Sequence, residues 1–134
     1  MKIKKSYPID KLSDIQLKKL TSLCHISCIT NMGINRRKKS FLNISIEYSS
    51  GRNTYGEYDP FINHIKIFTE HSNTIEEFVS TFIHEYTHYL QPTRTKYHKL
   101  LDEFGYVNHP FEIQARENEI IYSPIILKNI IKLL

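Results

Sequence analysis

The chain has 134 residues, of which 40% are hydrophobic and 24% charged, an ordinary balance for one globular domain over residues 1–134. Its formal net charge of +4 falls short of the clustered basic footprint of nucleic-acid binders, so we expect no nucleic-acid partner and a solvated loop at Arg36 to Lys39. The start, Met1 to Ser6, lacks the apolar core of a signal peptide, and no stretch approaches a membrane span. We therefore expect a monomer in the cytoplasm of a cell or of a viral host, with no membrane contact.

An amphipathic helix is predicted from Ile9 to about Asn31, packed across the back of a sheet. Apolar residues recur there at mixed helical spacing, and Asp10 or Ser13 can cap its start. Cys24 and Cys28 lie one helical turn apart, a poor geometry for an unstrained disulfide. Buried reduced thiols are expected at these two positions, in preference to metal ligands.

Three strands are predicted in the middle of the chain. Phe41 to Tyr48 alternates apolar and polar residues, which is typical of a half-buried strand. Thr54 to Tyr58 is expected to pair back as a short second strand. Ile62 to Phe68 marks a third strand, whose polar positions His64 and Lys66 indicate that one edge or face meets solvent or a ligand.

A helix is predicted over residues 74–91. Its apolar residues recur at the i, i+3, i+4, i+7 spacing of a buried stripe: Ile75, Phe78, Val79, Phe82, Ile83, Tyr86 and Leu90. Thr74 or Asn73 can cap its start through a capping box, and Pro92 ends it.

Within this helix, residues 84–88 read His-Glu-Tyr-Thr-His, an H-E-x-x-H motif. Residues four apart lie on one helical face, so His84 and His88 can bind one metal ion from the same side. Neutral imidazole suits zinc, and such a pair leaves room for a third protein ligand and a water molecule. Glu85 can reach that water as a general base without binding the metal.

The segment after the motif carries a candidate helix stop followed by two predicted helices. Residues 93–104 are polar with scattered apolar residues, and Gly105 can act as a helix stop. A helix is expected from about residue 110 to 122, where Pro110 suits the first helical position. Pro124 is expected to interrupt it, before a final apolar-faced helix from Ile125 to Leu134.

The third metal ligand is expected among the acids of this segment. Glu112 would lie in the first turn of the helix beginning near Pro110, the best position for closing the site. Ala115, one turn further, is small enough to let two helices approach. Glu119, two turns along the same face, can orient a histidine ligand.

With Glu112 inside a Pro-x-Glu-x-x-Ala pattern, the chain resembles gluzincin-type zinc metallopeptidases, in particular the minigluzincins and short phage- or virus-type metallopeptidases. The resemblance covers about residues 59–121. It implies an α+β, zincin-like fold, with a small twisted sheet packed on an N-terminal helix and the active-site helix, followed by C-terminal helices. Thermolysin-like members place an aspartate, bonded to the first histidine, where this chain has Arg116. Glu119 or Asp102 is expected to replace it.

The resemblance further implies a zinc endopeptidase acting on peptide or protein substrates. In the family, substrate lies extended along an edge strand, expected here at His64, Ile65 and Lys66. Tyr106 and His109, just before Glu112, are the candidates for donating a hydrogen bond to the oxyanion. Packing of an aromatic ring and capping of a helix would explain these two residues equally well.

A second hypothesis is a catalytically latent or degenerate zincin module that binds a protein partner. The chain is small for an enzyme with a deep cleft. Its tails, residues 1–7 and 125–134, are large enough to cover the cleft. An intact Glu85 favours the enzyme.

Overall fold

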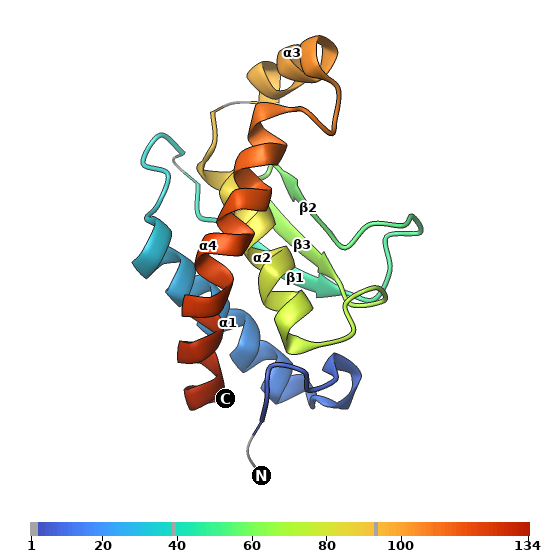
Figure 1. Cartoon of the computed structure of the whole chain (residues 1–134), viewed down its shortest axis with the longest axis vertical. Helices are drawn as coiled ribbons and strands as arrows, with labels where there is room; N and C mark the ends of the chain where they lie inside the picture. The colour runs from blue at the N-terminus through green and yellow to red at the C-terminus, as the bar shows by residue number, and fades with distance from the viewer. Residues whose placement is uncertain (1–2, 39, 93) are drawn as a thin grey trace.

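The computed structural model describes residues 3–38, 40–92 and 94–134 and has a mixed α+β architecture (Figure 1), which confirms the predicted α+β class. A 3-10 turn, η1 (Ile9–Lys11), precedes the helices α1 (Asp14–Met32), α2 (Ile75–Leu90), α3 (Arg94–Phe104) and α4 (Pro110–Leu133). The strands are β1 (Asn43–Glu47), β2 (Gly56–Asp59) and β3 (His64–Phe68). Among the described residues, no helix combines the length and the apolar character needed to cross a bilayer.

Helix α2 lies at the centre of the molecule, with β2 and β3 on one side and α1 and α4 on the other (Figure 1). Its predicted apolar stripe is buried from Ile75 to Tyr86, including Phe78 and Phe82, and Leu90 at its end is partly buried. Thr74 caps the helix, because its side chain accepts a hydrogen bond from the backbone N–H of Glu77. The spacing of apolar residues and the cap residue therefore predicted this helix correctly.

Helix α1 differs from its prediction in its start and in its packing. Ser13, rather than Asp10, is the cap and forms a capping box with Gln16, so Ile9 belongs to the separate turn η1. The helix packs against α4 and α2, so the prediction that it crosses the back of the sheet is wrong. Cys24 and Cys28 are free and buried, as predicted.

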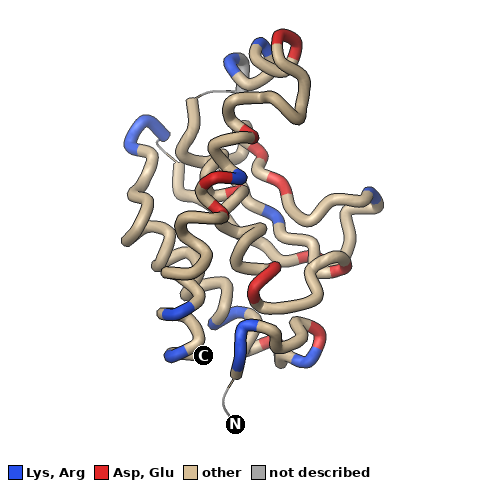
Figure 2. Tube along the Cα trace, in the orientation of Figure 1, with Lys and Arg blue, Asp and Glu red and all other residues tan. Residues whose placement is uncertain are grey.

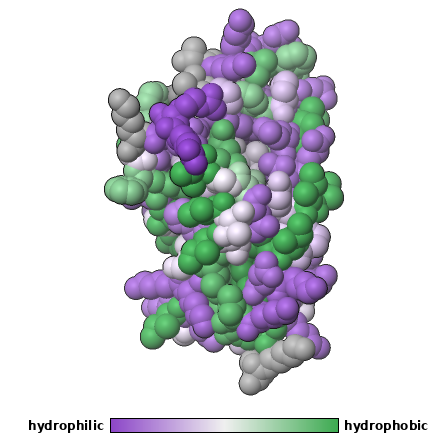
Figure 3. Space-filling model, turned by 90° about the vertical axis from the view of Figure 1, so that its left-hand side faces the viewer, coloured by the Kyte–Doolittle hydropathy of each residue, from purple (hydrophilic) through white to green (hydrophobic). Residues whose placement is uncertain are grey.

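The apolar residues of α1 are only partly used in the core. Leu20 is fully buried, whereas Ile15 and Ile26 are exposed to 80% and 60%. On the side of the molecule where α1 lies, apolar surface remains between polar side chains (Figure 3). The mixed spacing in the sequence thus reflects a helix whose buried face is narrow.

The sheet has the strand order β1-β3-β2. β3 pairs in parallel with β1 and antiparallel with β2, so the second strand does not pair back with the first as predicted. The prediction that His64, Ile65 and Lys66 form an edge strand is also wrong, because β3 is the central strand. The edge nearest α2 belongs to β2.

The polar residues of β3 identify a face of the sheet, not an edge. Ile65 is buried, while the side chains of His64 and Lys66 point to the opposite face, toward partners on β1. His64 lies 2.8 Å from the hydroxyl of Ser45, and Lys66 lies 3.7 Å from a carboxylate oxygen of Glu47. Alternation along a strand separates two faces and carries no information about which strands are neighbours.

Helix α4 continues through Pro124, so the predicted interruption is wrong. Proline offers no N–H to the carbonyl of Ile120, but Ile120 is 77% exposed, and water can reach that region. The turns after the proline are held by the burial of Ile126, Leu127 and Ile130. The helix α3 ends as predicted at Gly105, whose φ of 73° suits glycine and whose N–H bonds to the carbonyl of Leu101.

The basic run after α1 is solvated only in part. Arg36 and Arg37 are exposed, but the Lys38 ammonium donates hydrogen bonds to the hydroxyl of Tyr58 and to the carbonyl of Tyr89, and burial lowers its pKa to about 8. Lys39 lies outside the described residues. The basic residues of the described chain lie mostly at the two ends of the molecule and on outer loops (Figure 2).

Candidate metal centre

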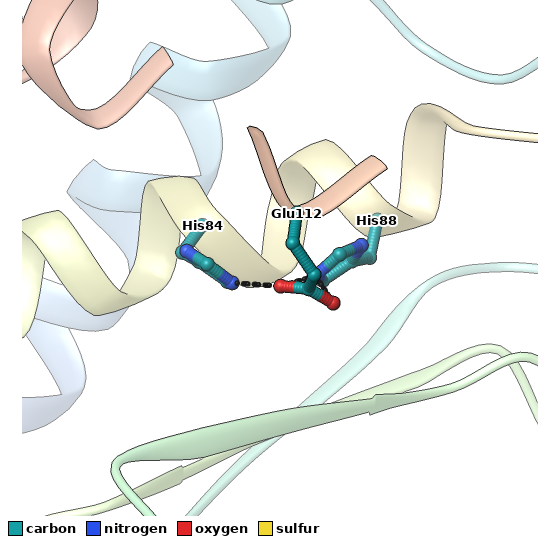
Figure 4. Close-up of side chains that lie close together, drawn as sticks. All are labelled: His84, His88 and Glu112. Carbon is teal, nitrogen blue, oxygen red and sulfur yellow. Dashed lines mark hydrogen bonds and ion pairs between the residues drawn. The ribbon is translucent and has the colours of Figure 1, made fainter. Parts of the chain in front are cut away.

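His84 and His88 project from the same side of α2, and Glu112 reaches between them from α4 (Figure 4). An oxygen of Glu112 lies 3.0 Å from Nε2 of His84 and 3.2 Å from Nε2 of His88. One ligand atom from each of the three residues falls within 4.8 Å of the others. Ala115 is fully buried, and its small side chain permits the close approach of α4 to α2 that this convergence needs.

The other nitrogen of each imidazole is held by an acceptor. Nδ1 of His84 lies 2.8 Å from a carboxylate oxygen of Glu119, and Nδ1 of His88 lies 2.7 Å from the amide oxygen of Gln91. Because both acceptors lack a hydrogen to give, each Nδ1 carries one. It is therefore Nε2 of each ring, the atom nearest Glu112, that can exchange between a proton and a metal ion.

Gln91 and Glu119 are themselves fixed by further hydrogen bonds. The amide nitrogen of Gln91 donates to the carbonyl of Phe111 and to the side chain of Gln114, which turns its oxygen toward His88. The second oxygen of Glu119 accepts from the hydroxyl of Ser80 at 2.7 Å. The orientation of both imidazoles thus depends on α4, the helix that also carries Glu112.

The electrostatics of the three converging groups favour a cation between them. Burial alone lowers the pKa of His84, but its hydrogen bonds to Glu112 and Glu119 outweigh burial and raise the pKa to about 10. Burial likewise raises the pKa of Glu112, but the hydrogen bonds from His84 and His88 hold it well below its ordinary value. The carboxylate therefore stays ionised and attracts either protons or a metal ion to the Nε2 atoms.

These residues line a cleft of about 580 Å³ that opens between α2, α4 and β2. Glu85 lies in its wall, is 7% exposed, and is not one of the three converging ligands. Burial raises the pKa of Glu85, while the neighbouring His88 and His84 oppose that shift. A buried carboxylate of raised pKa beside a cluster that could hold a metal ion has the properties expected of a general base.

Strand β2 passes directly over Glu85, and Gly56 makes this possible. A Cβ atom at Gly56 would lie 2.9 Å from Cγ2 of Thr81 and 3.2 Å from Cγ of Glu85. Along an antiparallel pair, opposite residues alternate between hydrogen-bonded and non-hydrogen-bonded pairs. The carbonyl of Tyr55 accepts from the N–H of Phe68, so these two residues form a hydrogen-bonded pair. The backbone N–H and C=O groups of Gly56 and Tyr58 therefore point away from β3. Among the described residues no strand pairs with this edge of β2, and the edge borders the cleft.

Of the two predicted oxyanion donors, only Tyr106 lines the cleft. Burial, with the charges of Glu112 and Glu85, raises the pKa of Tyr106. The prediction for His109 is wrong, because the residue is fully buried and both its ring nitrogens are engaged. Nε2 donates to the carbonyl of Tyr97 at 2.8 Å, and Nδ1 accepts from the N–H of Phe111 at 3.0 Å, which caps α4.

Of the two acids predicted to orient the first histidine, Glu119 contacts it in the structure. Glu119 bonds to His84, whereas Asp102 lies exposed on α3 and does not line the cleft. Arg116 points to the loop before α4, where Nη2 donates to the carbonyl of Val107 at 2.6 Å.

Sequence reasoning missed Tyr97, whose hydroxyl donates a hydrogen bond to the second oxygen of Glu112. Its ring stacks on His109 with the centroids 4.0 Å apart. No spacing singles out this residue among the chain's nine tyrosines. Gln91 was missed as well, although its position three residues after His88 on the same helical face was a usable signal.

The described parts of the two tails lie away from the cleft, contrary to the prediction that the tails cover it, and Met1 and Lys2 lie outside the described residues. The backbone of Tyr7 and Ile9 bonds to Ile75 and Asn73 at the start of α2, and the C-terminal end of α4 packs against the core through Ile130. The start of the described chain and its C-terminal end both lie at the lower end of the molecule in Figure 1. Of residues 3–7 and 125–134, none lines the cleft.

Comparison of the chain with models of protein families, with curated proteins and with solved structures finds no match.

Proposed function

We propose that the chain is a zinc-dependent metallopeptidase of the gluzincin type, with a zincin-like fold, acting as an endopeptidase on peptide or protein substrates. The observation that carries this proposal is the convergence of His84, His88 and Glu112 within 4.8 Å, with Glu85 beside them in the same cleft.

The donor set fits zinc well. Two imidazole nitrogens and one carboxylate oxygen form a three-ligand set of the kind found in catalytic zinc sites, which leave a position for water. Calcium and magnesium prefer oxygen ligands alone. Glu119 and Gln91 act as the outer partners that orient ligating histidines. When bound, zinc would lower the pKa of a water molecule and polarise a peptide carbonyl.

The chain's own groups supply the remaining chemistry. Glu85 is positioned to accept a proton from the attacking water and to return it to the leaving amine. A peptide that pairs with the free backbone groups of Gly56 and Tyr58 would extend the sheet and lie across the cleft above Glu85. Tyr106 is the candidate donor to the developing oxyanion.

The test is hydrolysis of a denatured protein mixture by zinc-loaded protein, with and without chelator. Glu85→Gln should retain zinc and the fold yet lose hydrolysis, because the amide cannot accept the proton. Glu76→Gln, an exposed change on the same helix, is the matched control and should remain active. Loss of zinc from Glu85→Gln would contradict the role of base. Stoichiometric zinc without any hydrolysis would favour a zinc-binding module that acts through a protein partner.

A further inference from the structure

Beyond His84 and Glu85, the cleft continues into a second hollow of about 430 Å³. Its wall is mostly neutral and polar, with Asn53, Thr54 and Thr81 from the loop before β2 and from α2. Arg116 and Glu119 of α4 and the ring of Tyr106 line another part of it, and the remaining lining residues are Tyr55, Gly56, His84 and Glu85. The hollow therefore lies immediately beside the atoms at which hydrolysis is proposed to occur.

The two opposite charges of α4 in this hollow do not neutralise each other. Glu119 uses one carboxylate oxygen for His84 and the other for Ser80. The guanidinium of Arg116 donates from Nη2 to the carbonyl of Val107, and within the described chain no ion pair joins it to a carboxylate. Arg116 thus brings a positive charge to a hollow that also holds two acids. Of these, Glu119 is engaged by His84 and Ser80, and burial raises the pKa of Glu85, which favours its neutral form.

We propose that this second hollow receives a carboxylate of the substrate peptide and that Arg116 determines this specificity. The inference rests on the proposed peptidase function. A guanidinium has five N–H donors in a planar fork that matches a carboxylate, and only part of this capacity is used by Val107. The half-buried position of Arg116 limits screening by solvent, which strengthens the attraction.

Two sources of carboxylate share this chemistry: an aspartate or glutamate side chain within the peptide, and the free carboxyl terminus. Both would place the charge next to the bond above Glu85. The first would make the protein an endopeptidase that prefers acidic residues, and the second would make it prefer bonds close to the end of a chain.

The experiment measures binding separately from hydrolysis. The probes are fluorescein-labelled Ala/Ser peptides in which a single glutamate is scanned along the positions, each paired with its glutamine counterpart, and each made with a free or an amidated C-terminus. Their affinity for zinc-loaded Glu85→Gln protein is measured by fluorescence anisotropy. At one position, or at the free terminus, the carboxylate peptide should bind about tenfold more tightly than its neutral partner, as a charge-assisted hydrogen bond implies.

Arg116→Gln in the same background tests the assignment to this residue. Glutamine is polar but uncharged, so the difference in affinity between each carboxylate peptide and its neutral partner should vanish. Arg116→Lys should retain part of the preference. Lys128→Gln, which removes the same charge from an exposed position further along α4, should leave it unchanged.

Equal affinity for carboxylate and neutral peptides at every position and at both termini would overturn the inference. That result needs only the Arg116-containing protein, so an unfolded Arg116 variant would not obscure it. The Glu85→Gln protein could prefer carboxylate peptides while the unsubstituted protein hydrolyses nothing. That result would support the carboxylate site and contradict the peptidase function. Hydrolysis without a carboxylate preference would uphold the peptidase and reject the carboxylate site.

Discussion

Glu119 accepts a hydrogen bond at 2.8 Å from Nδ1 of His84, a residue 35 positions earlier in the chain. Glu119 lies two turns beyond Glu112 on the same face of α4, so one helix supplies both a candidate metal ligand and the group that orients another candidate ligand. Arg116, four residues after Glu112, faces the preceding loop instead. The acid that contacts His84 is therefore Glu119 on α4 and not residue 116, the position that the thermolysin-like pattern uses.

Glu119→Gln is expected to weaken zinc binding by about 10- to 100-fold, the usual effect of losing an outer hydrogen-bond partner of a metal ligand. The amide cannot assist the basicity of His84 as a carboxylate does, although it can still accept a hydrogen bond. Competition with a fluorescent zinc chelator measures the change. Glu117→Gln, which alters an exposed residue two positions earlier, should bind zinc normally. An unchanged affinity of Glu119→Gln for zinc would show that Glu119 does not support metal binding through His84.

Glu112→Ala is expected to abolish stoichiometric zinc binding, because two imidazoles alone leave the site one protein ligand short. Elemental analysis of protein purified without added metal should give near one zinc per chain before the substitution and little after it. Glu103→Ala, an exposed change on α3, serves as the control. Full zinc retention in Glu112→Ala would transfer the role of third ligand to another acid.

The central helix and the placement of its two histidines on one face were predictable because the information is local. Ile75 to Leu90 carries a regular apolar stripe, Thr74 supplies a cap, and His84 and His88 are spaced by one turn. The position of Glu112 could be predicted as well, because Pro110 favours a helix start and places Glu112 in the first turn of that helix.

Features that depend on pairing between distant segments were not predictable. The polar residues His64 and Lys66 lie on one face of the central strand, although they were predicted to mark an edge strand. Strand order depends on contacts between distant segments, which the alternation of residues along one strand does not reveal. Pro124 was misread as a helix break, because the burial of Ile126 and Ile130 outweighs the lost hydrogen bond. Tyr97 reaches Glu112 only through the packing of α3 on α4, which no local pattern reveals.

The free energy of unfolding of the metal-free protein should fall as pH rises from neutral toward 10. Burial lowers the pKa of His84, but the hydrogen bonds to Glu112 and Glu119 outweigh burial and raise it from 6.5 to about 10. The protonated form is favoured by folding, so this stabilisation is complete below pH 6.5 and is lost as pH approaches 10. Urea unfolding at several pH values, after removal of metal by chelation, measures the slope.

Two controls assign this slope to His84. His84→Gln should flatten it, whereas His71→Gln, in the loop before α2, should preserve it. Bound zinc should also flatten the slope in this range, because the metal takes the place of the proton on Nε2. A metal-free protein whose stability is constant between neutral pH and 10 would contradict the proposed hydrogen-bonded cluster.

Gly56→Ala is expected to destabilise the protein by about 1–3 kcal/mol, the usual cost of overpacking, and to reduce hydrolysis further than the loss of folded protein explains. The added Cβ would lie 2.9 Å from Cγ2 of Thr81, 3.1 Å from the carbonyl oxygen of Lys66 and 3.2 Å from Cγ of Glu85. The Lys66 oxygen belongs to the backbone of β3 and cannot turn away, so β2 must shift, while the side chains of Thr81 and Glu85 can relieve only their own contacts by turning. A shift of β2 or a turn of Glu85 would change the distance between the strand edge and the Glu85 carboxylate. Thermal unfolding and hydrolysis rates corrected for folded protein measure the two effects, and Thr81→Ala should restore part of both by removing the nearest atom. A Gly56→Ala protein with unchanged unfolding temperature and activity would mean that the close passage of β2 over Glu85 is not needed for function.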